Sequence, residues 1–526
     1  MPAEQDKGYE VSHFAGRYAV GKNLSAVATK SGMHFNRPDV GDVRVLGGAC
    51  SEVLGGANLA KVLQSGFEKE TRVMEALRQS QPAEVLSVHT SAGVPAEMDA
   101  FLRALKPHLP VDGDDWCVNL QLEGASAAHA AIDMALQMSQ PGADLSAPGA
   151  RVRVACGASS YHGPASTSPG GAAPLGSAAK GLTHEARYPV PTPFLRRRGE
   201  CDEAFHARIF GEFEEYLDLY GHEIGVLMVE PQWGSSVGAM PWPPALLRRY
   251  VAAAQARGIA VVADEIMCGL GRHGAEPSRG GTGCFLSECW ELKPDAVTFG
   301  KAIGGGAGHV LSGAVLLHGA SRLQQTRHGT AYQSHTYAAS SSRALANATA
   351  LLEQLPSWRP HVRAIGDALA PIVAELNAKS GGAIIAHGQG AMWGGLFSHA
   401  DPAQRTRANL HFKRLCAESG LLPYFIPIGG FMLTPRYDDS PSELAAAVAR
   451  MAECALATVK EMGWSADELL PVASPAPVPR PPPLARGALG KSMAAFKAEV
   501  ASSARVAAIC AALGFGLGLV VLRRTK

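Results

Sequence analysis

The sequence predicts an α/β protein built on a large, mostly parallel β-sheet. Three short apolar runs in the middle third carry this prediction, at residues 225–229, 259–263 and 296–299, and a fourth follows at 312–317. Between the first two runs, residues 244–257 have the spacing of an amphipathic helix. Near-continuous apolar strands that alternate with helices are typical of a sheet buried on both faces.

An ionisable residue follows each of the first three runs. Glu230 and Asp264 come directly after their strands, and Lys301 follows one glycine later. Ligands of parallel α/β sheets bind beyond the carboxyl ends of the strands, so we expect the three side chains to face one crevice. Each one taken singly is better explained as a solvated loop charge. Only their occurrence together favours a site.

Composition excludes several classes of protein. Hydrophobic residues make up 47% of the 526 residues and the net charge is +1, a balance that disordered chains lack. We predict no nucleic-acid partner, because no basic excess is present to neutralise phosphates. The ten cysteines contain no C-x-x-C pair, so we predict neither a metal site nor a disulfide framework. The N-terminal residues lack the apolar segment of a secretory signal.

Two glycine motifs are poor candidates for nucleotide sites. Residues 269–274 match G-x-G-x-x-G, but no helical pattern follows them, as a dinucleotide fingerprint requires. Gly300 and Lys301 resemble the end of a phosphate-binding loop, but Ala302 occupies the position of the hydroxyl residue that binds magnesium. We therefore reject both interpretations.

Six segments of the chain resemble the class-III pyridoxal-phosphate aminotransferases. In chain order they are 122–133, 160–163, 229–234, 263–272, 292–306 and 328–338. The most specific part is the combination of Asp-Glu-Ile with Lys-x-x-Gly-Gly-Gly, read from residues 264–266 and 301–306. The order and the approximate distances match over about residues 43–460.

The resemblance implies roles for the residues around the expected cofactor, pyridoxal 5′-phosphate. Lys301 corresponds to the Schiff-base lysine, whose amine must be unprotonated to attack the aldehyde. Asp264 corresponds to the carboxylate that keeps the pyridine nitrogen protonated. Ile266 would pack under the ring and Tyr161 would stack on its other face. Glu230 would anchor the hydrogen bonds around the crevice.

The remaining implied residues concern the cofactor phosphate. Gly124, Ala125 and Ser126 precede a helix predicted over 127–138, and small residues at a helix start let main-chain N–H groups approach an anion. Thr330 would supply a hydroxyl to the phosphate of the neighbouring subunit.

Three departures from the family pattern leave questions open. The usual threonine of the phosphate-closing loop is Ala331, with Thr330 and Ser334 as alternative hydroxyls. Trp233 occupies the position that is often a polar partner of the cofactor, and Gln232 would replace it only if the turn shifts. Arg436 is the candidate for a substrate-carboxylate clamp by position, and a structural role fits it better.

The implied activity is transamination, from an amino acid or amine to a keto acid or aldehyde. A lyase, decarboxylase or aminomutase of the same fold, or a catalytically inactive scaffold, are the alternatives. The implied fold is the homodimeric fold type I. We assign residues 1–90 to the N-terminal part of a small α+β domain, 91–325 to the large cofactor-binding domain and 326–470 to the C-terminal part of the small domain.

The last part of the chain has a different composition. Residues 471–505 form a proline-rich linker and a short helix-compatible stretch. Residues 506–522 are 17 uncharged residues flanked by arginines, about 25 Å as a helix against about 30 Å of hydrocarbon. We predict a C-terminal membrane anchor with the catalytic body in the cytosol, on an organelle outer membrane. The alternative is an apolar helix docked on the enzyme body.

Overall fold

The computed structural model describes most of the first 470 residues. The described residues are 25–27, 33–37, 41–46, 50–70, 95–111, 113–145, 147, 149–157, 160–163, 188–194, 196, 200–305, 311–323, 325–326, 329–330, 341–426 and 428–470. The chain divides into two compact units, residues 1–472 and 473–526. All described residues belong to the first unit.

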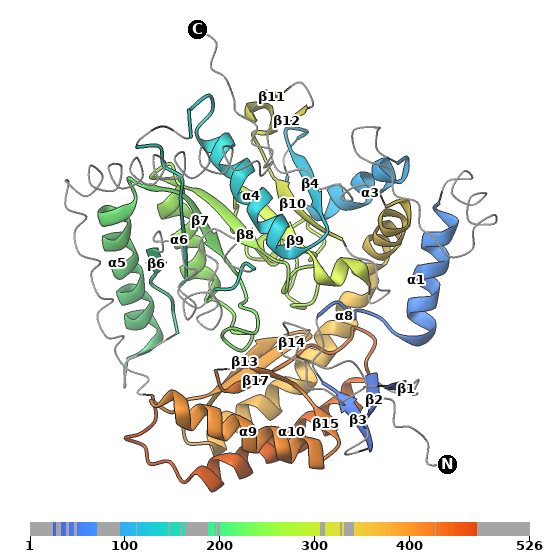
Figure 1. Ribbon diagram of the computed structural model, residues 1–526, viewed down its shortest axis with the longest axis vertical. Helices are drawn as coiled ribbons and strands as arrows, with labels where there is room; N and C mark the ends of the chain where they lie inside the picture. The colour runs from blue at the N-terminus through green and yellow to red at the C-terminus, as the bar shows by residue number, and fades with distance from the viewer. Residues whose placement is uncertain are drawn as a thin grey trace, which may run out of the picture. The chain divides into compact units, whose positions relative to one another are not determined.

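A seven-stranded sheet forms the centre of the first unit (Figure 1). From one edge to the other, its strands are β4 (Cys117–Gln121), β10 (Ser312–Leu316), β9 (Ala296–Phe299), β8 (Ala260–Asp264), β7 (Ile224–Val229), β5 (Arg153–Gly157) and β6 (Tyr188–Val190). β10 pairs antiparallel with both of its neighbours, and all other pairs are parallel. The predicted mostly parallel sheet is therefore confirmed.

Helices cover both faces of this sheet, which explains the continuous apolar runs. Along β7, Val226 and Met228 belong to a buried cluster with helix α4 (Gly124–Ser139). Leu227 and Val229, which point the other way, belong to a cluster with helices α5 (Asp202–Tyr220) and α6 (Pro244–Gln255). Successive side chains of a strand point to opposite faces. A strand with helices on both faces of its sheet therefore needs apolar residues at every position.

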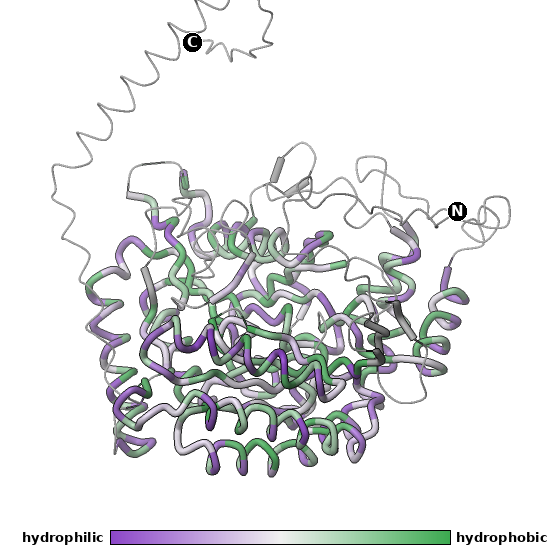
Figure 2. Tube along the Cα trace, turned by 60° about the horizontal axis from the view of Figure 1, so that its bottom comes forward, coloured by the Kyte–Doolittle hydropathy of each residue, from purple (hydrophilic) through white to green (hydrophobic). Residues whose placement is uncertain are grey.

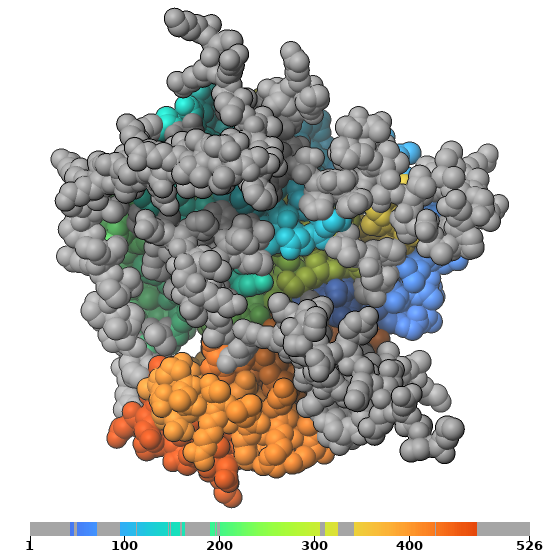
Figure 3. All heavy atoms as spheres, in the orientation of Figure 1, coloured from blue at the N-terminus to red at the C-terminus, as the bar shows by residue number. Residues whose placement is uncertain are grey.

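A second sheet and three helices form the C-terminal part of the unit. The sheet has the order β13 (Ile384–Gln389), β14 (Met392–Phe397), β17 (Gly430–Leu433) and β16 (Tyr424–Ile426), with antiparallel pairs throughout. Helices α8 (Ser342–Lys379), α9 (Pro402–Glu418) and α10 (Pro441–Met462) share its buried cluster. Figure 2 shows that the helices nearest the viewer carry both hydrophobic and hydrophilic residues, and Figure 3 shows the C-terminal residues as an orange region at the lower end of the view.

Segments from both ends of the chain meet in a smaller sheet. Strands β1 (Ser25–Val27), β2 (Met33–Arg37) and β3 (Gly41–Val45) form antiparallel pairs, and β15 (Leu421–Leu422) joins β3 in parallel. The remaining short elements are α1 (Gly56–Glu68), α3 (Glu97–Leu105), η3 (Lys106–His108), α7 (Leu286–Cys289), η5 (Lys301–Gly304), η6 (Ala320–Arg322), β11 (Gln325–Thr326) and β12 (Gly329–Thr330).

Two predicted helix boundaries differ from the structure. The helix expected over 127–138 begins at Gly124, because Glu123 already has the extended backbone of an N-cap residue and Ser126 donates a hydrogen bond to its carboxylate at 2.9 Å. The helix expected over 244–257 ends at Gln255. The motif at 269–274 lies in turns with no helix after it, as predicted.

The predicted membrane span lies outside the described residues. Within the part of the chain that the structure describes, no helix has the length and apolar character needed to cross a bilayer. The proline-rich segment also falls outside that part, so the predicted anchor stays a prediction.

A buried carboxylate beside the site gives a stability prediction. Glu265 accepts hydrogen bonds from the main-chain N–H groups of Leu286 and Ser287, at 2.6 and 2.8 Å, and so caps α7. Changing Glu265 to Ala leaves both buried N–H groups without this acceptor. We expect the free energy of unfolding to fall by about 2–4 kcal/mol, measured by urea titration, whereas Glu214→Ala on the exposed surface of α5 changes it by less than about 0.5 kcal/mol.

The stability lost in the Glu265→Ala variant should also depend on pH. Burial raises the pKa of Glu265 to about 7. Because the folded pKa lies above the unfolded value, the stability that Glu265 contributes decreases as pH rises through about 7. The loss in Glu265→Ala should therefore be larger at pH 5 than at pH 8. An equal loss at both pH values contradicts this account of the cap.

Candidate active site

The structure places the three strand-end residues at neighbouring positions. Strands β7, β8 and β9 are adjacent and parallel, so their carboxyl ends share one edge of the sheet. Glu230 follows β7, Asp264 is the last residue of β8, and Lys301 opens the short helix η5 after β9. Sheet topology thus brings together residues that are up to 71 positions apart in the sequence.

Asp264 is the centre of a buried hydrogen-bond network. Its Oδ2 lies 2.7 Å from Nδ1 of His162, and its Oδ1 accepts from the Thr298 hydroxyl at 2.9 Å and the Ile266 N–H at 3.1 Å. His162 and Asp264 are only 1% and 5% exposed. Burial tends to raise the pKa of Asp264, but these donors lower it below its usual value. Asp264 is therefore held as a carboxylate.

His162 is the partner that our sequence reasoning missed. Burial opposes its protonation, but the hydrogen bond and charge of Asp264 outweigh burial and raise the pKa of His162. Its Nε2 atom is buried and has no hydrogen-bond partner among the described residues. The available signal was the histidine in the segment 160–163, Ser-Tyr-His-Gly, to which the sequence analysis gave no role.

Glu230 connects two loops at the edge of the crevice. Its Oε1 accepts from the N–H of Tyr161 and its Oε2 from the N–H of Gly234, each at 3.2 Å. Burial, and then the charge of Asp264, raise the pKa of Glu230 to about 7, although His162 opposes the shift. Glu230 thus positions the Tyr161 segment through the main chain, in keeping with its expected anchoring role.

Glycines allow several segments to pack closely beside Asp264. A Cβ atom added to Gly124 would lie 2.9 Å from the Ile266 side chain, and one added to Gly300 would lie 3.1 Å from it. At Gly163, whose φ is +110°, a Cβ would lie 2.2 Å from that of Ala125. Glycine is required at these close approaches. The start of α4 and Gly300, the residue before Lys301, therefore both lie against the side chain of Ile266.

Lys301 has an unusual backbone and an uncommitted side chain. Its φ of +38° is rare for a residue other than glycine and costs on the order of 1–3 kcal/mol. The structure shows no hydrogen bond or ion pair between its amine and any described residue. Strain of this kind gathers at functional sites, and a free amine suits a nucleophile.

For the other residues expected to bind the cofactor, the structure gives fewer contacts. Tyr161 is about half exposed. Ser126 directs its hydroxyl to Glu123. Thr330 ends β12, where it pairs with Gln325, and its side chain lies outside the described part, as do Ala331 and Ser334. The choice of the phosphate-closing hydroxyl therefore stays open.

Two positions that departed from the family pattern have structural contacts. Trp233 is buried, stacks on Trp242 and donates to the Ser160 hydroxyl at 3.4 Å. The Gln232 amide donates to the carbonyls of Ala239 and Met392 at 2.8 and 3.0 Å, which ties the large sheet to β14. Neither side chain is therefore directed to a cofactor.

Arg436 is held away from the role of a carboxylate clamp. Its guanidinium pairs with Asp438 and Asp439 at 3.4 and 3.1 Å. A Cβ atom added to Gly55 would lie 1.8 Å from that guanidinium, so Arg436 also packs against the N-terminal segment. The contacts support the structural interpretation.

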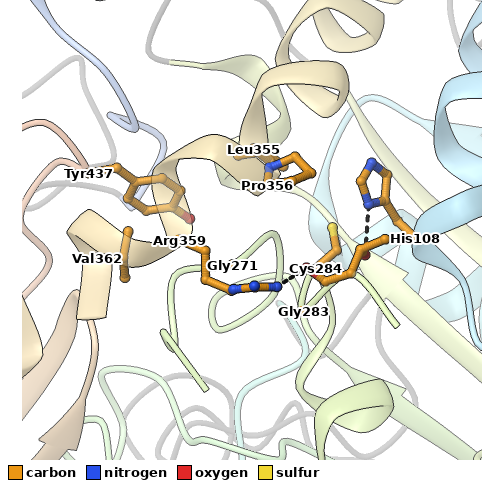
Figure 4. Close-up of a pocket in the computed structure, with 10 residues that line it drawn as sticks. His108, Gly271, Gly283, Cys284, Leu355, Pro356, Arg359, Val362 and Tyr437 are labelled. Atoms are coloured by element: carbon orange, nitrogen blue, oxygen red, sulfur yellow. Dashed lines mark hydrogen bonds between the residues drawn. The ribbon is translucent and has the colours of Figure 1, made fainter. Parts of the chain in front are cut away.

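A small internal cavity lies apart from these residues. Its volume is about 10 Å³, enough for about one water molecule. Figure 4 shows His108, Arg359 and Tyr437 around it. His108 Nδ1 lies 2.8 Å from the Thr282 hydroxyl, and Arg359 donates to the Thr282 carbonyl at 2.8 Å. These contacts hold the loop at 273–284, so the cavity is structural.

Comparison with known proteins agrees with this geometry. The family model described as Aminotransferase class-III matches residues 57–424. The chain belongs to this family. Acetylornithine aminotransferase of Xanthomonas axonopodis pv. citri (strain 306) is 30% identical over 235 residues, which cover 44% of the chain and 53% of that relative. Glutamate-1-semialdehyde 2,1-aminomutase of Clostridium perfringens (strain ATCC 13124) is 28% identical over 188 residues, or 34% and 40%.

These alignments are partial, and solved structures extend the comparison of the fold. The chain spans about half the length, or less, of these curated relatives. An omega-transferase from Vibrio fluvialis JS17 superposes with a TM-score of 0.66 at 16% identity, covering 84% of this chain and all of that one. An amine transaminase from an uncultivated Pseudomonas species gives 0.67 at 20% identity, with 86% and 99% covered. This likeness shows the fold, a mixed α/β architecture with a large sheet.

The family implies pyridoxal 5′-phosphate as the cofactor, and the described residues fit it. An ionised carboxyl group offers about four lone-pair positions, and Asp264 uses three for His162, Thr298 and Ile266. One position is left for a protonated ring nitrogen. Gly124 and Gly300 both pack closely against Ile266, the residue expected under the ring, and the amine of Lys301 has no partner among the described residues.

Proposed function

We propose that the chain is a pyridoxal-phosphate-dependent transaminase, which moves an amino group from an amino acid or amine to a keto acid or aldehyde. The observation that carries the proposal is Asp264, a buried carboxylate kept ionised by three donors one strand away from the free amine of Lys301. The test is incubation of holoenzyme with an amine, then with pyruvate. Appearance of pyridoxamine phosphate in the first step and alanine in the second supports the proposal.

Each residue of the site has a defined task in this proposal. Bound pyridoxal phosphate withdraws electrons from the substrate and so makes its Cα proton acidic. Lys301 would hold the cofactor through its amine, and the same amine would accept and give back the Cα proton of the substrate. Asp264 supplies the negative charge opposite the ring nitrogen, and His162 orients Asp264. Glu230 holds the Tyr161 segment against the site.

An aminomutase is the second candidate, because one of the relatives carries that name. An aminomutase moves the amino group within one molecule, whereas a transaminase needs two substrates. Holoenzyme that consumes an amine only when a keto acid is added is a transaminase. Product formation from one substrate alone favours the aminomutase, lyase or decarboxylase interpretation. Cofactor absorbance absent from the purified protein favours the inactive scaffold.

We also propose a homodimer in which each subunit contributes to the other's site. The family resemblance supports this proposal, since the loop around Thr330 corresponds to one that reaches the phosphate of the neighbouring subunit. Sedimentation of the protein at micromolar concentration should give twice the mass of the chain, 110 kDa against 55.0 kDa. A stable monomer that turns over substrate contradicts the proposal.

We propose further that residues 506–522 anchor the chain to a membrane. The segment has 17 uncharged residues, Arg505 before it and Arg523 and Arg524 after it, and such arginines extend to the bilayer surface. A proline-rich stretch within residues 471–505 precedes the segment in the sequence, and such a composition favours a semi-rigid spacer. The expected location is an organelle outer membrane, with the catalytic body in the cytosol.

Truncation tests the anchor separately from the enzyme. The full chain should stay in the membrane fraction after carbonate washing, and a chain ending at Leu470 should be soluble and still bind cofactor. Full-length protein that is released by carbonate overturns the anchor. Fractionation against organelle markers then identifies the membrane.

A further inference from the structure

Helices α9 and α10 each carry a buried cysteine. Cys416 is the last buried residue of α9, and Cys454 is one of the buried residues of α10. Both belong to the buried cluster of the C-terminal sheet, and both thiols are free. A bond between the two sulfur atoms would join one helix to the other.

Two contacts between the helices fix the level of these cysteines. Nδ1 of His411, on α9, lies 3.2 Å from the Thr458 hydroxyl of α10. The hydroxyl of Ser419, directly after α9, lies 3.4 Å from the sulfur of Cys454. The partner on α10 comes earlier in the sequence as the residue on α9 comes later, so the two helices run antiparallel.

Helix geometry then places Cys416 beside Cys454. Cys416 is five residues beyond His411 on α9, about 7.5 Å along the axis. Cys454 is four residues before Thr458 on α10, about 6 Å in the same direction. Cys416 is also three residues before Ser419, and residues at this spacing are neighbours on a helix surface. Since the Cys454 sulfur contacts Ser419, the Cys416 thiol lies next to that sulfur.

The surroundings favour a thiolate at Cys454. A hydrogen bond from the Cys416 thiol lowers the pKa of Cys454 below its usual value, burial opposes this shift, and the Ser419 hydroxyl adds to it. Burial, and then the bond to Cys454, raise the pKa of Cys416, so this cysteine keeps its proton. One thiolate therefore stands beside one thiol.

Four other cysteines of the described part are kept in the thiol form. Burial raises the pKa of Cys117, Cys268, Cys284 and Cys289. The thiolate is the reactive form of cysteine, so burial makes these four slow to react. Cys201 is exposed and serves as the reference for a thiol that reacts through access alone.

We propose that Cys416 and Cys454 are an oxidation site, at which a peroxide converts the two thiols into a reversible disulfide between α9 and α10. Cys454 is 8% exposed and its neighbour Ser419 is partly exposed. The Cys454 sulfur thus lies at the edge of the buried cluster, within reach of a small peroxide. The inference does not depend on the proposed transaminase function.

The reaction has two steps, with the peroxide as the co-reactant. The Cys454 thiolate attacks one peroxide oxygen, an S–O bond forms, the O–O bond breaks, and the second oxygen leaves as hydroxide, which takes a proton from solvent. The Cys416 sulfur then attacks the Cys454 sulfur, the S–S bond forms, and the hydroxide that leaves takes the Cys416 proton. The two sulfurs lose two electrons and the peroxide gains them, so hydrogen peroxide becomes two molecules of water.

Peptide mapping of the peroxide-treated holoenzyme tests the proposal. The full chain is treated with increasing amounts of hydrogen peroxide, unfolded in iodoacetamide to block the remaining thiols, digested, and analysed by mass spectrometry. We expect a peptide pair that links Cys416 to Cys454 and separates again in dithiothreitol. At the dose that links half of the protein, Cys201 should still be alkylated. Oxidation of Cys201 while Cys416 and Cys454 remain thiols overturns the proposal.

Three variants separate the roles of the two sulfurs. Cys416→Ala removes the second thiol, so Cys454 should stop at the sulfenic acid, which dimedone traps. Cys454→Ala should leave Cys416 unoxidised at the same dose, and the matched control Cys201→Ala should form the disulfide as wild type does. Oxidation of Cys416 in Cys454→Ala at the wild-type rate overturns the proposal. The melting temperature shows whether each variant is folded, and for one that is not, the mapping of the wild-type chain decides.

Discussion

Replacing Asp264 by Asn should lower kcat by at least about a thousandfold, which corresponds to about 4 kcal/mol of lost transition-state stabilisation. The amide keeps the shape of the carboxyl group but removes its charge. Without that charge the ring nitrogen of the cofactor loses the partner that keeps it protonated, and the ring accepts electrons less readily. Cofactor binding should persist, measured by absorbance after gel filtration.

The same substitution should leave the protein folded. A neutral His162 can donate its Nδ1 proton to the Asn oxygen, so the buried contact at 2.7 Å keeps its hydrogen bond. The pKa of His162 should fall, because Asp264 is what raises it. Wild-type turnover in the Asp264→Asn variant contradicts the role of Asp264. A melting temperature more than about 10 °C below wild type assigns the lost activity to the fold instead.

Changing Lys301 to Ala should abolish detectable transamination. The change removes the only amine that our account places at the cofactor aldehyde. It should cost little stability, because the amine has no partner among the described residues. The circular dichroism spectrum and the melting temperature should stay within a few degrees of wild type.

Two variants complete the Lys301 experiment. Lys301→Arg keeps a positive charge but cannot form the covalent bond, so it should be as inactive as Lys301→Ala. Lys293→Ala removes another lysine with positive φ, +52°, outside the site, and should stay active. Activity in either Lys301 variant contradicts the assignment.

The strand ends were predictable because two simple rules agree there. Continuous apolar runs are required when helices cover both faces of a sheet, as the split of β7 between two clusters shows. Parallel strands bring their carboxyl ends to one edge, which grouped Glu230, Asp264 and Lys301 before any contact was known.

The partners of these residues were harder to predict. His162 meets Asp264 across 102 residues of sequence, and no local pattern reveals that distance. The close approach of Gly163 to Ala125 is likewise a tertiary contact. The resemblance supplied the segments but not their contacts.

Trp233 and Arg436, whose roles the sequence left open, have structural roles for different physical reasons. Trp233 departs from the family pattern because it belongs to the aromatic core with Trp242, and side-chain packing of this kind depends on distant residues. For Arg436 the sequence favoured a structural role over a carboxylate clamp, and two aspartates that follow it pair with its charge. That local signal, Arg-Tyr-Asp-Asp, was visible and fits the structural role.

The most direct test of the account is the location of the cofactor bond. Holoenzyme is reduced with sodium borohydride, digested, and the peptides are mapped by mass spectrometry. The account predicts that the pyridoxyl group is found on Lys301, in the peptide that continues from β9, and that Lys301→Ala carries none. A pyridoxyl group on any other lysine of the wild-type chain contradicts it.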